Sequence, residues 1–220
     1  MKIGVIGAGN VGTALAKRLA PRGHEVMLSY SRDAQKLKAV AKAFGALSGT
    51  LAEAARFGEV IALTVRWQSV ETAIDQAGPL NGKILWDCTN AMKPDLGGLA
   101  IGTTTSAAET VQRLAPGARI VKGIPPFAEL LHSDDPTIEG VPAASFLCGD
   151  DADAKRIVGP LLEALPATVV DAGPLENARY VEPAGFLLVR LAYGLGLGSR
   201  IGLSLLRSLP RDATPECEMQ

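Results

Sequence analysis

Three glycines near the start of the sequence have the spacing of a phosphate-binding turn. Gly7, Gly9 and Gly12 form G-x-G-x-x-G within GAGNVG, directly after the apolar segment 2–6 and before apolar residues at helical spacing. In that context the first glycine permits a tight turn, the second lets the backbone approach a pyrophosphate, and the third allows close helix packing. The helix N-terminus then offers N–H groups and partial positive charge to phosphate oxygens. The segment predicts a dinucleotide site; a structural glycine turn without a ligand is the alternative.

The residues at the end of the second expected strand, 25–29, predict which nicotinamide cofactor is bound. Ser29, Ser31 and Arg32 stand where an acidic residue would bind the ribose hydroxyls of NAD. Hydroxyls and a guanidinium suit a 2′-phosphate instead, and Lys36 adds a positive charge one helical turn later. Each charged hydrogen bond contributes about 1.5–3 kcal/mol, so NADP(H) should be preferred over NAD(H) by about tenfold or more. The alternative is that Arg32 is a solvated surface residue.

The rest of the sequence supplies the elements that position these residues. Strands are expected at 2–6, 25–29, 60–65, 83–87, 119–122, 144–148 and 168–171, with helices among them at 34–44 and 151–165. Repeated strand–helix–strand units predict an α/β fold with a Rossmann-type, doubly wound, mainly parallel sheet. Asp33 is expected to begin the first of these helices, and Ser106, with Glu109 three residues later, to cap another.

The C-terminal part of the sequence has a different character. The segment 176–209 has a helical pattern throughout, interrupted by GLGLG at 194–198, and predicts a small C-terminal helical appendage. We therefore expect an NADP-binding Rossmann domain at 1–174 and a C-terminal helical segment at 175–220. Apolar residues go nearly all round the helix near 186–195, which predicts burial between two subunits of a homodimer.

Composition narrows the class of protein further. The chain has 220 residues, 47% hydrophobic and 20% charged, with a net charge of −1. These values are typical of a soluble globular protein and give no reason to expect nucleic acid or membrane surfaces as partners. Cys88, Cys148 and Cys217 are far apart, and with only two histidines no metal site is expected. Isolated cysteines without a leader or membrane span fit a reducing, cytoplasmic location.

Two further side chains could be taken for functional groups. Cys88 follows a strand, but no histidine is placed to activate it, so a packed thiol is expected. His132 is expected in a surface loop.

The sequence resembles the coenzyme-F420-dependent NADP oxidoreductase family over almost its whole length. The segments that carry the resemblance are GAGNVGTALAKRLAPRGHEV, SR at 31–32, LTVRWQSV, DCTNAMKPDL, TTSAAE, LCGDDADAK, DAGPLENARYVEP and YGLGLG. The first segment alone also fits pyrroline-carboxylate reductases, whereas its combination with the later ones is more specific. The resemblance implies a Rossmann domain and small C-terminal helical part, commonly dimeric, with a deazaflavin (F420) or flavin-like acceptor in the cleft between them.

The resemblance also implies which residues bind the cofactor. They are Gly7, Gly9, Asn10, Val11 and Gly12 at the pyrophosphate, Ser31 and Arg32 at the 2′-phosphate, and Thr64, Val65, Trp67, Thr89 and Asn90 at the ends of two later strands. Trp67 is equally explained as an aromatic residue at the boundary of the core. No catalytic side chain is expected, because the two cofactors carry the hydride chemistry and the protein orients them.

Two departures from the family pattern leave the acceptor open. Arg66 stands where the family usually has proline before the tryptophan. The segment VKGIPPF has Gly123 to Pro126 where relatives usually have Ala-Phe-Asn-Thr, so an amide side chain is absent and two rigid prolines are present. The alternatives are therefore a reductase of free flavin, a metal chelate, or an imine or carbonyl compound, and a non-catalytic NADPH-binding redox sensor.

Overall fold

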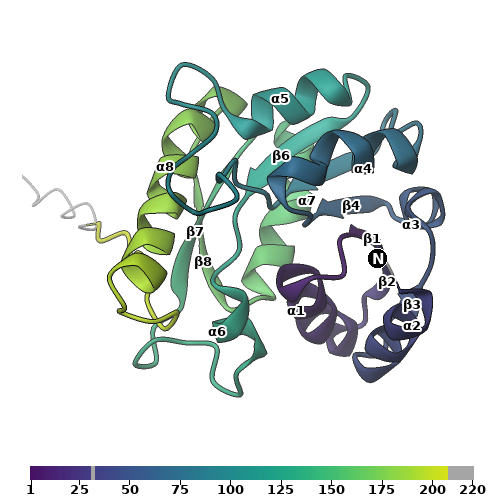
Figure 1. Ribbon diagram of the computed structural model, residues 1–220, viewed down its shortest axis with the longest axis horizontal. Coiled ribbons are helices and arrows are strands. Elements are labelled where there is room, and N and C mark those ends of the chain that lie inside the picture. The colour runs from purple at the N-terminus through teal and green to yellow at the C-terminus, as the bar shows by residue number, and fades with distance from the viewer. Residues whose placement is uncertain (31–32, 208–220) are drawn as a thin grey trace, which may run out of the picture.

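A single eight-stranded sheet organises the computed structural model, which describes residues 1–30 and 33–207 (Figure 1). The strands are β1 (Lys2–Ile6), β2 (Glu25–Ser29), β3 (Leu47–Ser48), β4 (Val60–Leu63), β5 (Ile84–Asp87), β6 (Arg119–Gly123), β7 (Ala143–Cys148) and β8 (Ala167–Asp171). Their order is β3-β2-β1-β4-β5-β6-β7-β8, and each neighbouring pair is parallel except β6 and β7. The predicted Rossmann-type, mainly parallel α/β fold is confirmed.

Helices cover both faces of this sheet. The helices that pack on one face are α1 (Asn10–Leu19), α2 (Ala34–Ala43), α6 (Ala128–His132) and α7 (Ala152–Glu163). Those on the other face are α3 (Leu51–Phe57), α4 (Val70–Ala77), α5 (Ala107–Leu114) and α8 (Ala178–Val189). Short 3-10 turns lie at Ala20–Arg22, Trp67–Ser69 and Leu175–Asn177.

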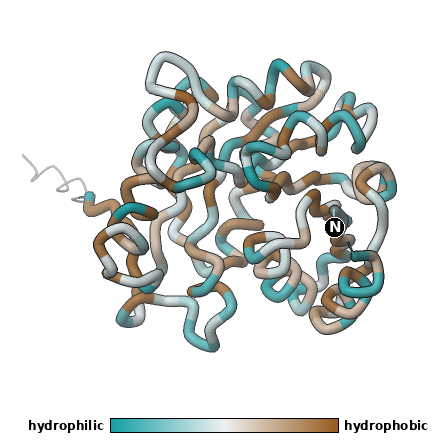
Figure 2. Tube along the Cα trace, in the orientation of Figure 1, coloured by the Kyte–Doolittle hydropathy of each residue, from teal (hydrophilic) through white to brown (hydrophobic). Residues whose placement is uncertain are grey.

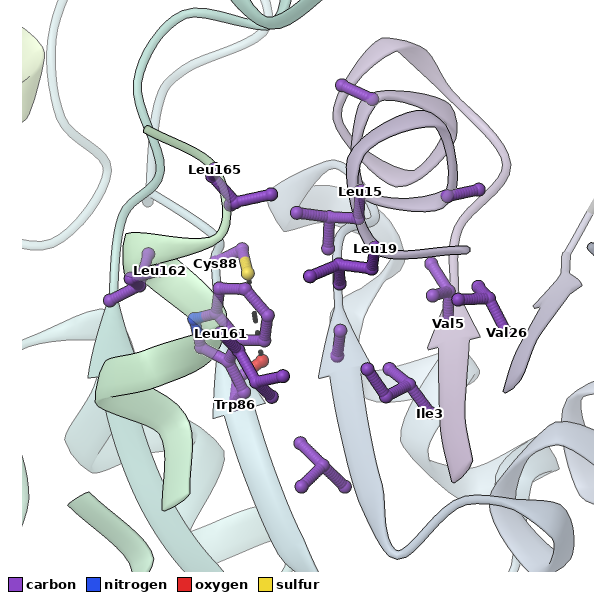
Figure 3. Packing of buried hydrophobic residues seen from close by; sticks show 14 of the residues in the cluster. Ile3, Val5, Leu15, Leu19, Val26, Trp86, Cys88, Leu161, Leu162 and Leu165 are labelled. Atoms are coloured by element: carbon purple, nitrogen blue, oxygen red, sulfur yellow. Dashed lines mark hydrogen bonds between the residues drawn. The ribbon is translucent and has the colours of Figure 1, made fainter. Parts of the chain in front are cut away.

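The core on the first face is built around Trp86 of β5. Figure 3 shows its ring with Leu162 of α7 on one side and Leu15 and Leu19 of α1 on the other, and Leu161 of α7, from the same buried cluster, overlaps the ring in this view. All of these side chains are at most 2% exposed. Burying each leucine contributes roughly 1.5–3 kcal/mol, so this cluster fixes α1 and α7 on the sheet.

Side-chain caps set the starts of three helices. Asp33 accepts hydrogen bonds from two N–H groups of α2, and Ser106 accepts one from Glu109 in α5, as expected from the sequence. Thr50 and Glu53 form a reciprocal capping box at α3. Each such cap contributes typically about 1 kcal/mol.

The expectation of helix over the whole segment 176–209 is wrong. Helix α8 ends at Val189, one π-helical turn follows at Arg190–Gly194, and residues 195–207 are not helical. Gly196 and Gly198 have φ values of +73° and +77°, a left-handed conformation that does not continue an α-helix. The chain then returns to the sheet, where the Ala144 N–H donates to Leu203 O at 2.8 Å.

Within residues 1–30 and 33–207, no helix has the length and apolar character that crossing a bilayer requires. The division into domains at residue 174 stays a prediction, although the last strand does end shortly before that point, at Asp171.

Candidate dinucleotide site

The carboxyl ends of β1, β4, β5 and β6 meet at one edge of the sheet. The chain runs outward from β1 through β2 to β3 on one side and from β4 onward on the other, so the strand order reverses between β1 and β4. In open α/β sheets, ligands bind in the crevice at such a switch point. The glycine turn between β1 and α1 lies at this position.

The first and third glycines of the turn are required by close packing. Gly7 has a φ of +129°, and a Cβ there would lie 2.6 Å from Thr64 Oγ1. A Cβ on Gly12 would lie 1.7 Å from Gly7 O, a distance that no real side chain tolerates. The Thr64 hydroxyl donates to Gly7 O at 2.9 Å, so the end of β4 holds the turn in place. The structure thus brings together Gly7, Gly12 and Thr64, three of the residues predicted to bind the cofactor.

Gly9 differs from its two neighbours because a Cβ there would meet no atom within 4 Å. This glycine is the N-cap of α1, no side chain caps the helix, and its first turn carries no acidic residue. Asn10 is exposed beside it and Val11 is half-buried. An uncapped helix N-terminus facing open space is suited to an anion such as a pyrophosphate.

The end of β2 corrects one expectation. Ser29 is fully buried, and its hydroxyl donates to Val5 O at 2.8 Å inside the sheet, so it is not available to a 2′-phosphate. Tyr30, the next residue, is 38% exposed and has a φ of +62°, which is rare for a bulky residue. Ser31 and Arg32 lie outside the described residues. Lys36 is exposed on α2.

The loop that follows β4 is hydrogen-bonded to the loop that follows β5. Val65 is buried, while Trp67 is half-buried and packs against the apolar cluster on the second face of the sheet. Gln68 Nε2 donates to Met92 O at 2.9 Å, which links the two loops. This packing is the core-boundary role considered for Trp67.

A buried ion cluster underlies the end of β5. Lys122 of β6 is completely buried, and its Nζ lies 3.0 Å from Asp87 Oδ2 and 3.1 Å from Glu182 Oε1 of α8. Asp87 Oδ1 accepts hydrogen bonds from the Thr89 N–H and hydroxyl at 2.8 and 2.7 Å. Burial by itself lowers the pKa of Lys122, but the two carboxylates outweigh it and raise that pKa above its ordinary value.

Glu182 also connects α8 to α5. Its carboxylate oxygens accept the N–H groups of Ala107 and Ala108, at the start of α5, at 2.8 and 3.0 Å. Beside it, Arg179 binds Glu109 through two N–H groups at 2.6 and 3.0 Å. The N-terminal half of α8 is therefore fixed by charge to α5 and, through Lys122, to β5 and β6.

Asn90 lies where this cluster meets the edge of the sheet. Its Nδ2 donates to Glu182 O at 2.9 Å. Its Oδ1 is buried and, among the described residues, has no hydrogen-bond partner.

Sequence reasoning did not identify Asp87, Lys122 and Glu182 as functional residues. A signal was present, because Lys122 interrupts the apolar strand RIVKG and Glu182 interrupts the apolar segment YVEPAGF. Charged residues are almost never fully buried unless paired, so two such interruptions of opposite sign indicate a buried pair.

The loop between β6 and α6 is held from both sides. The Trp86 Nε1–H donates to Gly123 O at 2.8 Å, and the Ser145 hydroxyl donates to Ile124 O at 2.6 Å. Pro125 is buried. The loop therefore presents backbone and apolar groups, without an amide side chain.

The expectation of a surface-loop position for His132 is wrong. This residue ends α6 and is half-buried, with Nε2 3.1 Å from Asn10 O and 3.2 Å from Thr13 Oγ1 of α1. Lys17 and Arg18 of α1 donate to carbonyls at the end of α6 as well. The two helices are thus joined beside the glycine turn.

The buried cysteines are unsuited to nucleophilic chemistry. Burial and the nearby Asp87 raise the pKa of Cys88 far above its ordinary value, and burial raises the pKa of Cys148 to about 12. Both thiols therefore stay protonated at neutral pH, as expected for packed cysteines. Among the residues that the structure describes, no cluster of three or more His, Cys, Asp or Glu could hold a metal ion.

A hollow of about 660 Å³ lies elsewhere, between the ends of α4 and α5 and the loops that lead into β5 and β6. Its lining includes Glu71, Asp75, Asn81 and Pro116. These loops enter the strands at their amino ends, so the hollow is at the opposite edge of the sheet from the glycine turn.

Comparison with known proteins agrees with the fold and the glycine turn. The family model "NADP oxidoreductase coenzyme F420-dependent" matches residues 2–91. The curated protein metalloreductase STEAP3 of Rattus norvegicus is 28% identical over 183 residues, which are 82% of this chain and 36% of that protein. A glycerol-3-phosphate dehydrogenase [NAD(P)+] of Azorhizobium caulinodans is 30% identical over 92% of this chain and 62% of its own length. The chain thus spans less than two thirds of either curated relative.

A solved structure from Arthrobacter sp. fb24 matches over nearly the whole of this chain. That protein, proposed to be an F420-dependent NADP-reductase, is 32% identical in sequence and has a TM-score of 0.81, with 94% of this chain and 100% of that chain covered. With this similarity and the match of the family model, the chain belongs to the family of coenzyme-F420-dependent NADP oxidoreductases.

Proposed function

We propose that this NADP-dependent oxidoreductase transfers hydride between NADPH and a deazaflavin (F420) or flavin-like acceptor. The observation that carries the proposal is the glycine turn at the switch point, where Gly7 and Gly12 close the packing and Gly9 leaves space before an uncapped helix. The open space at Gly9, before the N-terminus of α1, fits a pyrophosphate. Membership of the family suggests that the dinucleotide is NADP(H) and that the acceptor is a deazaflavin or a similar molecule. Bound nicotinamide and acceptor rings supply the hydride chemistry, and the chain supplies their placement.

Three of the described features would contribute to that placement. The N-terminus of α1 offsets phosphate charge, and Thr64 keeps the turn in shape. The Lys122 cluster holds the end of β5 and α8 together on one side of the sheet. The buried, protonated thiols of Cys88 and Cys148 are compatible with a transfer that needs no protein nucleophile.

Absorbance at 340 nm, a property of reduced nicotinamide, tests the activity. With F420 present, the purified protein is expected to consume NADPH at a rate that depends on protein concentration. FMN is the matched flavin probe. Binding of NADPH without reduction of either acceptor would contradict the proposal and favour a cofactor-binding sensor.

A second candidate is a reductase of another small acceptor, such as an imine or carbonyl compound. The observation that favours it is the loop at Gly123–Phe127, which is fixed by Trp86 and Ser145 and offers no amide side chain to a planar ring system. Reduction of such a compound in the same assay, with F420 left unreduced, would decide for this candidate.

The 2′-phosphate site is tested by the change Arg32→Ala. We expect the affinity for NADPH to fall by about tenfold or more, because a charged hydrogen bond contributes about 1.5–3 kcal/mol, while the affinity for NADH changes little. Titration of protein fluorescence with each cofactor measures both affinities. An equal loss for the two cofactors would refute this role.

We also propose that a second copy of the chain covers the apolar surface beyond the fixed half of α8. Large apolar side chains there are half or more exposed: Leu187 at 54%, Tyr193 at 51%, Leu195 at 70% and Leu197 at 61%. Hydrophobic residues continue along this segment toward the grey trace in Figure 2. A patch of this kind is characteristic of protein interfaces, and a monomer mass in sedimentation equilibrium would rule the homodimer out.

A further inference from the structure

One histidine contacts the first turn of α1, the helix whose N-terminus faces the open space at Gly9. His132 Nε2 lies 3.1 Å from Asn10 O and 3.2 Å from Thr13 Oγ1. A carbonyl oxygen only accepts hydrogen bonds, so Nε2 carries a hydrogen and donates it. The Thr13 hydroxyl in turn donates to Gly9 O at 2.9 Å. The imidazole is therefore hydrogen-bonded to α1 within one turn of Gly9.

The imidazole is held in this position by two neighbouring helices. Phe44, at the end of α2, contributes an uncharged contact, with its ring centroid 5.9 Å from that of His132. Lys17 and Arg18 of α1 donate to backbone carbonyls at and beside His132. Helix α6 thus ends on α1 through its backbone as well as its ring, which keeps the ring against the first turn.

The charges around the imidazole are mainly positive. Lys17 and Arg18 reach the end of α6, and the N-terminus of α1 adds partial positive charge. Of the acidic groups near it in sequence, Glu129 accepts a hydrogen bond from the Tyr193 hydroxyl at 3.1 Å, and Asp134 attracts Arg18. A proton on the ring is therefore poorly compensated in the ligand-free chain. An anion at the N-terminus of α1 would supply the negative charge that is needed.

We propose that His132 is a positioning residue for the pyrophosphate of NADP(H), and that its protonated form strengthens binding. The inference rests on the proposed function, in which the pyrophosphate binds at Gly9 and the N-terminus of α1. The neutral ring holds Asn10 and Thr13 through its Nε2–H group, and a proton taken up at Nδ1 adds a full positive charge beside the same turn. Imidazole changes its charge between about pH 5 and pH 8, so the affinity for the cofactor should rise as the pH falls through this range.

The test compares wild-type protein with His132→Gln, using isothermal titration calorimetry with NADP+ at about pH 5.5 and about pH 8. The glutamine amide has an N–H group in place of Nε2–H, so it can keep the hydrogen bond to Asn10 O, but it takes up no proton. At the lower pH the wild type is expected to bind about fivefold more tightly than the variant, the size expected for one charge several ångströms from a phosphate near the surface. At the higher pH the two should bind equally. The 2′-phosphate also titrates, near about pH 6, but it contributes equally to both proteins.

Two further variants separate the charge from the hydrogen bond. His24 is the other of the two histidines in the chain, and it precedes β2, at the opposite end of the parallel strands from the glycine turn. His24→Gln is therefore the matched control and should keep the wild-type dependence on pH. His132→Ala lacks the hydrogen bond as well as the charge, and at about pH 8 it should bind NADP+ about fivefold more weakly than His132→Gln.

The outcomes distinguish this inference from the function on which it rests. If wild type and His132→Gln show the same dependence on pH, or if His24→Gln abolishes that dependence, the role of the His132 charge is overturned while NADP+ binding stands. Binding by His132→Ala as tight as the wild type at the higher pH would overturn the positioning role. If wild-type protein binds no NADP+ at either pH, the proposed function fails, and the inference fails with it.

Discussion

Replacing Lys122 by methionine is expected to lower the free energy of unfolding by about 3–5 kcal/mol. The ammonium group is completely buried between Asp87 and Glu182, so its removal leaves two carboxylates facing each other without a cation. Methionine has nearly the same length and fills the space, so the effect reports the lost charge. Urea unfolding followed by circular dichroism measures it.

The matched control for this change is Arg156→Met. Arg156 pairs with Asp153 at 2.8 Å, but their side chains are 76% and 71% exposed. Exposed pairs contribute about 0–1 kcal/mol, so this variant should unfold almost like the wild type. Equal unfolding free energies for the two variants would show that the buried cluster does not stabilise the fold.

The direction of the pKa shift gives the pH range of this contribution. The pKa of Lys122 is raised above its ordinary value of 10.5 in the folded chain. The stabilisation by its charge is therefore complete below about 10.5 and is lost as the pH rises through the higher folded value. Measurements near neutral pH record the full effect.

Replacing Gly9 by alanine is expected to weaken NADPH binding by about hundredfold and to leave the fold intact. The ligand-free chain has space for the new methyl group, and the φ of −82° is allowed for alanine. That space is where the pyrophosphate would approach the backbone, so the methyl group would displace it from the N–H groups of α1. Loss of two charged hydrogen bonds accounts for an effect of this size.

Two measurements on Gly9→Ala are needed together. Fluorescence titration gives the NADPH affinity, and urea unfolding without cofactor should differ from the wild type by no more than about 1 kcal/mol. Gly12→Ala is the contrasting variant, because its Cβ would lie 1.7 Å from Gly7 O and should destabilise the ligand-free protein. Unchanged NADPH affinity in Gly9→Ala would place the pyrophosphate elsewhere.

Local signals in the sequence were sufficient for most of the fold. Apolar strands alternate with helices, and Gly7, Gly9 and Gly12 have a spacing whose physical meaning holds in the structure. Asp33 and Ser106 cap their helices because short polar side chains at those positions satisfy free N–H groups. These features depend on residues close together in the chain.

Features that depend on distant residues could not be predicted in the same way. Ser29 looked like a ligand donor, but Val5 on the neighbouring strand takes its hydroxyl, and only the pairing of β1 with β2 reveals this. Lys122 and Glu182 are 60 positions apart, and their pairing depends on how α8 packs over the sheet. The end of α8 at Val189 was misjudged because apolar residues continue past it.

The return of the chain to β7 limits how far this protein can be shortened. Strand β7 pairs with β6 only near Leu147 and Cys148, so residues 143–145 of β7 have no partner in β6. There the Ala144 N–H donates instead to the carbonyl of Leu203. Gly202 fits there because it lacks a side chain, as a Cβ would lie 2.6 Å from that of Ala143. Truncation before residues 202–203 would uncover this edge of β7, and an uncovered strand edge is a template for aggregation. Shorter versions of the chain should therefore retain these residues.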